Sequence, residues 1–504
     1  MQLPLGVSRL ASKRRYRQTG QRLSRKLLFD SRDMVFWATP STIPEVSYLS
    51  PTTDAEISLS WAEPGSMLSR SRYFGESMHA AARLYQMDQC LYSTAGTTFN
   101  VQASFQYLHG FNPRMKILLP DNLHLSAAAS VQRYHLTPEF YRLGYDPEFE
   151  TFVPISPEDM SHVLDKRDDV GAVLIVDPCY GGASGHLSRV IRAIREHDEN
   201  IIVVVDAAWG SHFIHLKDGP RPASTCGADL VLHSLHKTGG GRQSTELLMW
   251  DEDRIDTATM MATYRDLATP SPNYPLLNNI ANVVEYTYSK GRRSVANVVR
   301  KAERLRKLVS TEIPAARILD SKWALNRREH VAGVDPIATT IAYTQFKVIG
   351  YQIGRRLNGG GFVTEKDGLN SSLFMATFQL PKLAPDWTSA ALEKILGKAF
   401  RADGKWLGQP HINHLVHRDL LATWTFPFAA FEEVPIERAI GRRLGENLVV
   451  YPPGVPIRIK GEILDSSTCS YLQHVHSVGG HIATADETFT TVKVLKEDRS
   501  IWSK

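Results

Sequence analysis

A lysine and an aspartate about thirty positions apart both follow short apolar runs that are typical of buried strands. Asp206 comes directly after Ile201-Ile202-Val203-Val204-Val205, and Lys237 comes shortly after Asp229-Leu230-Val231-Leu232. A carboxylate at the end of a buried strand is poorly solvated, which favours a cationic partner. A lysine in such a place loses part of its hydration, which frees its amine to form an imine with a carbonyl group.

An amine that forms imines and an acid that needs a cation suit pyridoxal 5′-phosphate (PLP). A carboxylate beside the pyridine nitrogen of PLP keeps it protonated, so that the ring can accept the electrons of a carbanion. Each residue alone also has an ordinary explanation: Asp206 could cap a helix or bind a metal, and Lys237 could be a surface residue. Their pairing on neighbouring strands favours PLP bound as a Schiff base on Lys237.

Two further segments could hold the phosphate of such a cofactor. Ser234 and His236 alternate with Leu235, so both can face one side, and three glycines follow at 239–241. The turn Ser93-Thr94-Ala95-Gly96-Thr97-Thr98 enters a predicted helix near Phe99, where backbone amides and hydroxyls favour an anion. Turns of this composition also cap helices that bind nothing.

His124 comes just after the apolar run Lys116-Ile117-Leu118-Leu119. A single histidine is more often a structural residue than a functional one. Its place at the end of a predicted strand of the same sheet supports a second interpretation, in which the imidazole ring stacks on a cofactor.

The elements that must position these residues alternate between strands and helices. The runs named above and Val173-Leu174-Ile175-Val176 predict strands buried on both faces. Between two of them, apolar residues recur at helical spacing. Strand, amphipathic helix and strand in this order predict a parallel sheet covered by helices. In such sheets, ligands bind beyond the carboxyl ends of the strands. The apolar residues of this helix are Leu187, Val190, Ile191 and Ile194.

The rest of the chain predicts a second, smaller domain. Residues 276–310 are predicted to be helical, and from about Val334 short runs such as 336–341 and 373–378 alternate with helical stretches. We therefore expect an α/β fold of three parts. These are a basic N-terminal arm and dimerisation segment (1–75), a cofactor-binding large domain (76–330) and an α+β C-terminal domain (331–504).

The composition is that of a globular protein, with 43% hydrophobic and 22% charged residues among 504 and a net charge of +5. Eight of the basic residues lie within 1–29, where there is no acid. Such an arm could bind nucleic acid or anionic lipid or act as a transit peptide, but a solvated or partner-docking tail is the simpler interpretation. We expect no nucleic acid as a partner.

Membrane and metal sites are not indicated by the sequence. No apolar run approaches the length of a membrane helix, and no secretory signal is evident, so we expect a cytoplasmic protein without a membrane partner. The four cysteines, Cys90, Cys179, Cys226 and Cys469, are far apart, which predicts reduced and mostly buried thiols and no metal site.

Together these segments resemble the Orn/Lys/Arg decarboxylases, a family of PLP-dependent enzymes with the fold type I, aspartate-aminotransferase-like architecture. The resemblance covers about residues 76–330 and part of the C-terminal region. It is carried by Gly96-Thr97-Thr98, His124-Leu125-Ser126, Asp177-Pro178-Cys179-Tyr180-Gly181-Gly182, Asp206-Ala207-Ala208-Trp209, Ser234-Leu235-His236-Lys237 and Thr269-Pro270-Ser271-Pro272-Asn273-Tyr274-Pro275-Leu276. The motif Tyr451-Pro452-Pro453-Gly454-Val455-Pro456, followed by Gly461-Glu462, separates the decarboxylases from most aminotransferases.

The resemblance implies a role for each matching residue. Lys237 would carry the cofactor, Asp206 would pair with its pyridine nitrogen, and His124 would stack on its ring opposite Ala208. The phosphate would be held by Gly96, Thr97, Ser234 and His236, and the pocket would be lined by Trp209 and His212.

The resemblance also implies the reaction and the assembly. The expected function is decarboxylation of lysine, ornithine or arginine to the amine and CO2, in a homodimer or larger oligomer whose site lies between subunits. Glu432 and Glu433 are candidates for binding the distal cation of the substrate, although paired acids are usually a solvated face. An oxidase, aminotransferase, aldolase or racemase reaction on the same scaffold, or a non-catalytic regulatory homologue, stays an alternative.

The sequence departs from the family pattern at several places. Ala95 stands where an asparagine is usual, Asp177 and Cys179 alter a Ser-Pro-Thr, and the segment 239–244 is one residue shorter than its counterpart. These changes bear on the substrate more than on the cofactor. Because only about 75 residues precede the first match, we expect the short form of the family, without a flavodoxin-like N-terminal domain.

Overall fold

The computed structural model describes residues 35–37, 70, 72–346, 348–397, 430–486 and 488–496. The basic arm and almost all of the segment 1–75 lie outside the described residues.

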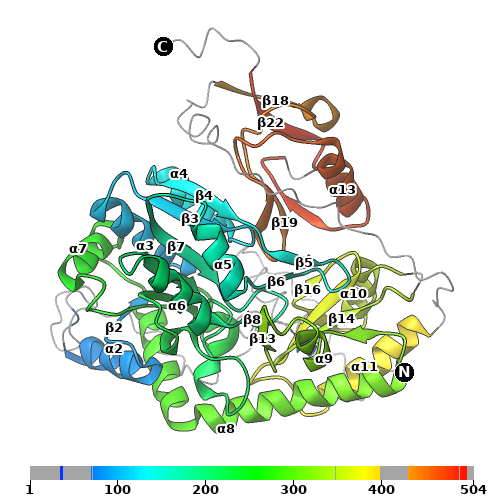
Figure 1. Cartoon of the computed structure of the whole chain (residues 1–504). Helices are drawn as coiled ribbons and strands as arrows, with labels where there is room; N and C mark the ends of the chain where they lie inside the picture. Colours follow the sequence, from blue (N-terminus) through cyan, green and yellow to red (C-terminus); the bar gives the residue numbers. More distant parts are fainter. Residues whose placement is uncertain are drawn as a thin grey trace, which may run out of the picture.

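A seven-stranded sheet forms the centre of the large domain (Figure 1). Its order is β2-β11-β10-β9-β7-β3-β4, and only β11 runs antiparallel to its neighbours. The predicted α/β fold with a mainly parallel sheet is therefore confirmed. The strands are β2 (Gln89–Ser93), β3 (Lys116–Pro120), β4 (Thr137–Tyr141), β7 (Val170–Val176), β9 (Ile202–Asp206), β10 (Leu230–Ser234) and β11 (Glu246–Trp250).

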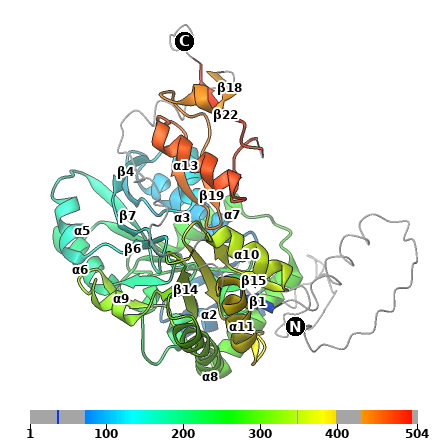
Figure 2. The same cartoon turned by 90° about the vertical axis from the view of Figure 1, so that its right-hand side faces the viewer.

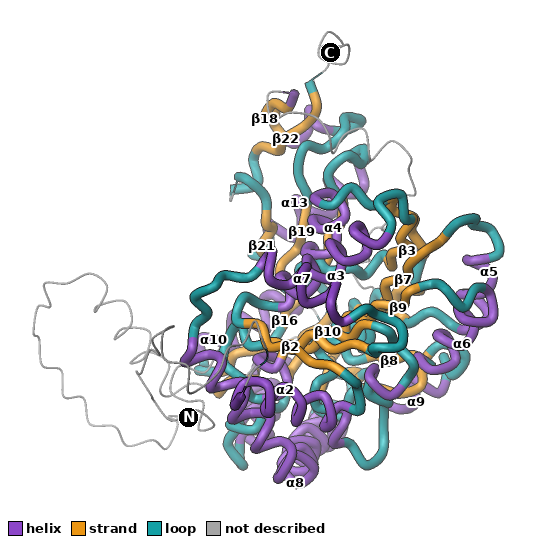
Figure 3. Tube along the Cα trace, turned by 90° about the vertical axis from the view of Figure 1, so that its left-hand side faces the viewer, coloured by secondary structure: helices purple, strands orange, loops and turns teal. Residues whose placement is uncertain are grey.

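Helices lie along this sheet (Figure 3). All five residues of β9, of β10 and of β11 are buried, as expected for strands with helices on both faces. The predicted amphipathic helix is α6, whose four named apolar residues are all buried. The helices are α2 (Arg72–Tyr85), α3 (Thr97–Phe111), α4 (Leu125–Arg133), α5 (Pro157–Leu164), α6 (Leu187–His197) and α7 (Thr257–Leu267).

A single 39-residue helix, α8 (Tyr274–Glu312), connects the large domain to a second sheet (Figure 1). Leu277 and Val283 near its start belong to the core of the large domain, whereas Leu305 and Val309 belong to the core of the second sheet. This four-stranded sheet is antiparallel, in the order β12-β14-β17-β16, and α11 packs on α8 beside it. The elements are β12 (Arg317–Ile318), β14 (Ala338–Ala342), β16 (Lys366–Asp367), β17 (Ser371–Met375), α10 (Gly350–Gly359) and α11 (Ala384–Leu396).

The described residues of 430–496 form a third body, whose hydrophobic core also takes in Ile349 and Leu369 (Figure 2). A three-stranded sheet, β20-β19-β21, and the pair β18-β22 surround helix α13. The elements are β18 (Phe431–Pro435), β19 (Leu448–Tyr451), β20 (Val455–Arg458), α13 (Ser466–Ser477), β21 (His481–Ala483) and β22 (Thr491–Leu495). The boundary predicted at residue 330 stays a prediction, although 331–396 and 430–496 build separate sheets.

Two further expectations can be compared with the described part of the chain. All four cysteines are buried with free thiols, as predicted. Among the described helices, none combines the length and the apolar character that a bilayer-spanning segment requires.

Candidate active site

A cavity of about 580 Å³ lies where the carboxyl ends of the central strands meet the other two bodies. Its walls come from the large domain, from the segment 363–368 beside the second sheet, and from the loop 450–455 of the C-terminal body. Nine of the predicted site residues line it, although they are spread over 142 positions of the sequence: Gly96, Thr97, His124, Asp206, Ala208, Trp209, Ser234, His236 and Lys237.

Lys237 enters this cavity from a short π-helical turn, Leu235–Gly239, which begins as β10 ends at Ser234. Gly240 closes the turn with a φ of 87°, a conformation that L side chains rarely adopt. The ammonium nitrogen of Lys237 lies 4.9 Å from the centre of the Trp209 ring, which Tyr180 meets edge-on. The turn thus directs the amine away from the sheet and over an aromatic wall.

Asp206 is the last residue of β9, and its side chain is buried at the base of the cavity. Its carboxylate accepts a hydrogen bond from the Ala208 N–H at 3.1 Å. Burial raises the pKa of Asp206, and the nearby charge of Lys237 opposes that shift. A second cation at the cavity end of β9 would therefore stabilise the ionised acid.

His124 is the N-cap of α4, where its Nδ1 accepts a hydrogen bond from the Ser126 N–H at 3.1 Å. Burial, helped by the charge of Lys237, lowers the pKa of His124 to about 4. The ring is therefore neutral at pH 7, and since Nδ1 is an acceptor, the proton is on Nε2.

The Tyr-Pro-Pro-Gly motif packs directly against this histidine. Gly454 has a φ of 89°, and a Cβ atom added to it would lie 2.9 Å from His124 Nε2. The Gly454 carbonyl accepts a hydrogen bond from the Leu125 N–H at 2.9 Å. The C-terminal motif therefore holds the first residue of α4 in place and packs against one edge of the His124 ring.

The beginning of α3 forms a potential anion site in the wall of the cavity. Its N-cap, Gly96, has a φ of 79°, and no side chain caps the helix. A Cβ atom at Gly96 would meet nothing within 4 Å, so the backbone is open at this point. The Thr97 hydroxyl lies within hydrogen-bonding distance of the Ser234 hydroxyl, which brings two of the predicted phosphate ligands together.

The cavity also carries a carboxylate that no sequence motif indicated, next to the Tyr180 ring. Glu365 lies between β15 (Phe362–Thr364) and β16, and its Oε1 accepts a hydrogen bond from the Tyr180 hydroxyl at 2.9 Å. Both residues line the cavity, as does Tyr451 of the C-terminal loop. Tyr180 lies within a quoted motif, but nothing in the local sequence of Glu365 indicates chemistry.

Three residues considered from the sequence do not line this cavity. Glu432 and Glu433 are exposed on β18, where they pair with Arg442 and Lys493. Within this chain they therefore fit the other interpretation given above, a solvated face. His212 is buried beside the cavity, and its Nε2 lies 2.9 Å from Asp335, so it supports the wall from behind.

The departures at Asp177 and Cys179 also lie behind the wall. Asp177 accepts hydrogen bonds from the Ser184 hydroxyl and the Gly185 N–H, and burial raises its pKa to about 7. Within the described ranges, no three His, Cys, Asp or Glu side chains are grouped so as to hold a metal ion.

Comparison with known proteins agrees with this geometry. Residues 46–350 match the Orn/Lys/Arg decarboxylase major domain, and residues 422–484 match the C-terminal domain of the same family. An arginine decarboxylase of Halalkalibacterium halodurans is 25% identical, over 84% of this chain and 86% of that protein. Among solved structures, the constitutive lysine decarboxylase of Escherichia coli has a TM-score of 0.69 at 18% identity, over 87% of this chain and 75% of that one.

Proposed function

Because the chain belongs to the Orn/Lys/Arg decarboxylase family, we propose that it removes the α-carboxylate of a basic amino acid, arginine or lysine first among them, using PLP. The observation that carries this proposal is the meeting of Lys237, Asp206 and His124 in one cavity that Glu365 also lines. When bound, PLP supplies an electron sink for the carbanion that loss of CO2 leaves behind.

Several features support PLP as the group that this cavity holds. The buried carboxylate of Asp206, whose pKa is raised, suits a protonated pyridine nitrogen. The uncapped start of α3 at Gly96 suits a phosphate, and Lys237 offers the amine for covalent attachment. His124 and Ala208 would flank the ring, as the family resemblance implies.

Glu365 is the proposed partner of the substrate's distal cation. Its Oε1 accepts a hydrogen bond from the Tyr180 hydroxyl, and a carboxylate forms strong, charge-assisted bonds with an ammonium or a guanidinium group. The edge-on pair of Tyr180 and Trp209 lies beside it and would cover the aliphatic part of the side chain. This arrangement selects substrates with a long cationic side chain.

The charges around the cavity favour decarboxylation over transamination. No arginine is found among the described residues that line it. The second lysine of the lining, Lys366, donates to the Glu150 carbonyl at 3.2 Å, and burial lowers its pKa. A substrate α-carboxylate held without a guanidinium partner is poorly stabilised, which favours its departure as CO2. Lys237 Nζ can then hold the proton that replaces it at Cα.

The direct test is product analysis by mass spectrometry after incubation with PLP and each basic amino acid, with and without oxygen. We expect the CO2-depleted amine of arginine or lysine in both atmospheres. Lys237→Ala, the matched control, should give no amine and lose the visible absorbance of bound PLP. A keto acid, a product that requires oxygen or no turnover would contradict the proposed reaction.

The assembly is proposed on the family resemblance alone. We expect a homodimer or larger oligomer with the cavity close to the subunit interface. Light scattering of the purified protein would give the molar mass, and a monomeric protein with full activity would contradict this part of the proposal.

A further inference from the structure

The three side chains proposed to hold the cofactor's phosphate all surround a fourth residue, Glu246. It is the first residue of β11, where it pairs in register with Ser234 of β10 and Ser93 of β2, and its side chain is fully buried. The Thr97 hydroxyl donates a hydrogen bond to one of its carboxylate oxygens. His236 Nδ1 lies 2.8 Å from the other, although the two are not aligned as a hydrogen bond.

The Glu246 carboxylate takes up hydrogen-bond donors that a bound phosphate would need. The single hydroxyl hydrogen of Thr97 points to Glu246, and the Ser234 hydroxyl can then donate to Thr97 Oγ1. His236 presents Nδ1 to Glu246. With Glu246 ionised, the Thr97 hydroxyl and His236 Nδ1 are directed to its carboxylate, and the Ser234 hydroxyl is directed to Thr97. Only the backbone amides of α3 and His236 Nε2 are then left to donate to a phosphate.

The charges of the neighbouring elements do not cancel this effect. The ionisable groups that face this end of the cavity are Asp206 from β9 and His236 and Lys237 from the turn after β10, whereas β2 and α3 contribute only hydroxyls. Glu246 contributes to the raised pKa of Asp206, so its charge reaches across the site. A phosphate monoester carries a charge of about −1.5 to −2 at pH 7 and would be repelled in the same way.

We infer that Glu246 is an internal competitor for the phosphate pocket, which holds Thr97, Ser234 and His236 when PLP is absent and makes the cofactor readily exchangeable. This inference rests on the proposed function, because it takes PLP as the ligand. With PLP bound, the Thr97 hydroxyl would turn from Glu246, and the Ser234 hydroxyl from Thr97, towards the phosphate, which would leave the carboxylate with His236 alone.

The test compares the dissociation constants of PLP and of pyridoxal, which lacks the phosphate, for wild type and Glu246→Gln. The amide has the same size and still accepts from Thr97, but it carries no charge. We expect PLP to bind the variant at least ten-fold more tightly, and pyridoxal to bind both proteins equally. Glu252→Gln removes the same charge from an exposed residue beyond the other end of β11 and should change neither constant.

The outcomes separate this inference from the proposed function. If wild type binds PLP and Glu246→Gln binds it no more tightly, or gains equally for pyridoxal, the competitor role is overturned while PLP remains the cofactor. If neither protein binds PLP, the cofactor assignment fails and the inference fails with it. A measurement on wild type alone needs no variant: PLP should bind less than about ten-fold more tightly than pyridoxal, and a much larger advantage would contradict the inference.

Discussion

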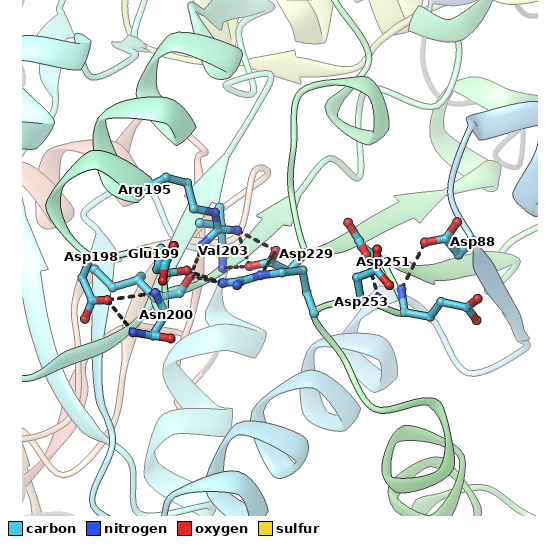
Figure 4. A network of polar contacts seen from close by, with 12 residues as sticks. Asp88, Arg195, Asp198, Glu199, Asn200, Val203, Asp229, Asp251 and Asp253 are labelled. Carbon is cyan, nitrogen blue, oxygen red and sulfur yellow. Dashed lines mark hydrogen bonds and ion pairs between the residues drawn. The ribbon is translucent and has the colours of Figure 1, made fainter.

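Two buried aspartates at opposite ends of neighbouring strands differ in how the protein treats their charge. Asp229 precedes β10 at the amino end of the sheet. Both of its carboxylate oxygens accept a hydrogen bond from Arg195 at 2.6 Å (Figure 4). The carboxylate also accepts one from Arg254 at 3.2 Å and one from the Val203 N–H at 2.7 Å. Asp206 ends β9 at the carboxyl end, where the Ala208 N–H and the charge of Lys237 stabilise it.

The difference shows that burial alone does not identify a functional acid. Both aspartates adjoin apolar runs and both are buried, but the protein neutralises Asp229 completely and exposes Asp206 to the cavity. A carboxylate whose partners are supplied by the fold contributes to stability, whereas one that lacks them is costly until a ligand arrives. The following variants test whether the two ends of the sheet divide these roles.

The largest effect should come from Asp206→Asn. The amide cannot keep a pyridine nitrogen protonated, so we expect turnover to fall on the order of a thousand-fold. The free energy of unfolding should stay within about 1 kcal/mol of wild type, because the variant removes a buried charge that the fold stabilises poorly. Steady-state kinetics and urea unfolding would measure the two effects, and a large loss of stability with little loss of turnover would reverse the comparison.

Asp229→Asn should have the opposite signature. It leaves Arg195 and Arg254 without their carboxylate, and we expect the free energy of unfolding to fall by about 3 kcal/mol, the low end for a broken buried pair because both arginines are partly exposed. Turnover per folded molecule should not change. Asp253→Asn is the matched control, an exposed acid nearby that should alter stability by less than about 0.5 kcal/mol (Figure 4).

Glu365→Gln tests a second acid on the cavity side of the sheet. Loss of the proposed charge-assisted bond to the substrate's distal cation should weaken kcat/KM for arginine or lysine by about thirty-fold, or about 2 kcal/mol, mostly through KM. Binding of PLP should be unaffected. Glu432→Gln on exposed β18 provides the control, and an equal loss in that variant would show that Glu365 is not specific.

The sequence predicted the sheet and the residues at its carboxyl edge because both depend on local patterns. Apolar runs mark β3, β7, β9 and β10, and strand ends place Asp206 and Lys237 beside each other whatever the rest of the chain does. Glu365 and Tyr180 come together across 185 positions through packing of the second sheet on the first, which no local pattern encodes. Glu432 and Glu433 could not be placed from the sequence for the same reason, since paired acids indicate charge but not location.

The basic arm was predicted from composition and the assembly from family resemblance. No contact among the described residues tests either prediction.

Glu246 was missed for a physical reason. It begins a strand whose apolar residues are easily recognised, but only the pairing of β11 with β10 and β2 brings its buried side chain against Thr97 and His236, which line the cavity. A single acid at a strand start gives no such signal.

The smallest effect concerns the pH dependence of stability at His124. Its folded pKa of about 4 lies below the value of about 6.5 for an unfolded histidine, so the unfolded chain binds the extra proton between these values. Stability contributed by the neutral ring is therefore complete above pH 6.5 and is lost as pH falls towards 4. At pH 5 this loss amounts to about 2 kcal/mol relative to pH 7.5.

The unfolding curve of wild type alone cannot isolate this effect. Burial raises the pKa values of Asp121 and Asp177 to about 7, so their protonation stabilises the folded protein as pH falls through part of the same range. The difference between wild type and His124→Gln removes their contribution. That difference should shift by about 2 kcal/mol in favour of the variant between pH 7.5 and pH 5. The same measurement on His481→Gln, an exposed residue of β21, should show no shift, and an equal shift there would mean that the cavity end of the sheet imposes no special cost on a charged His124.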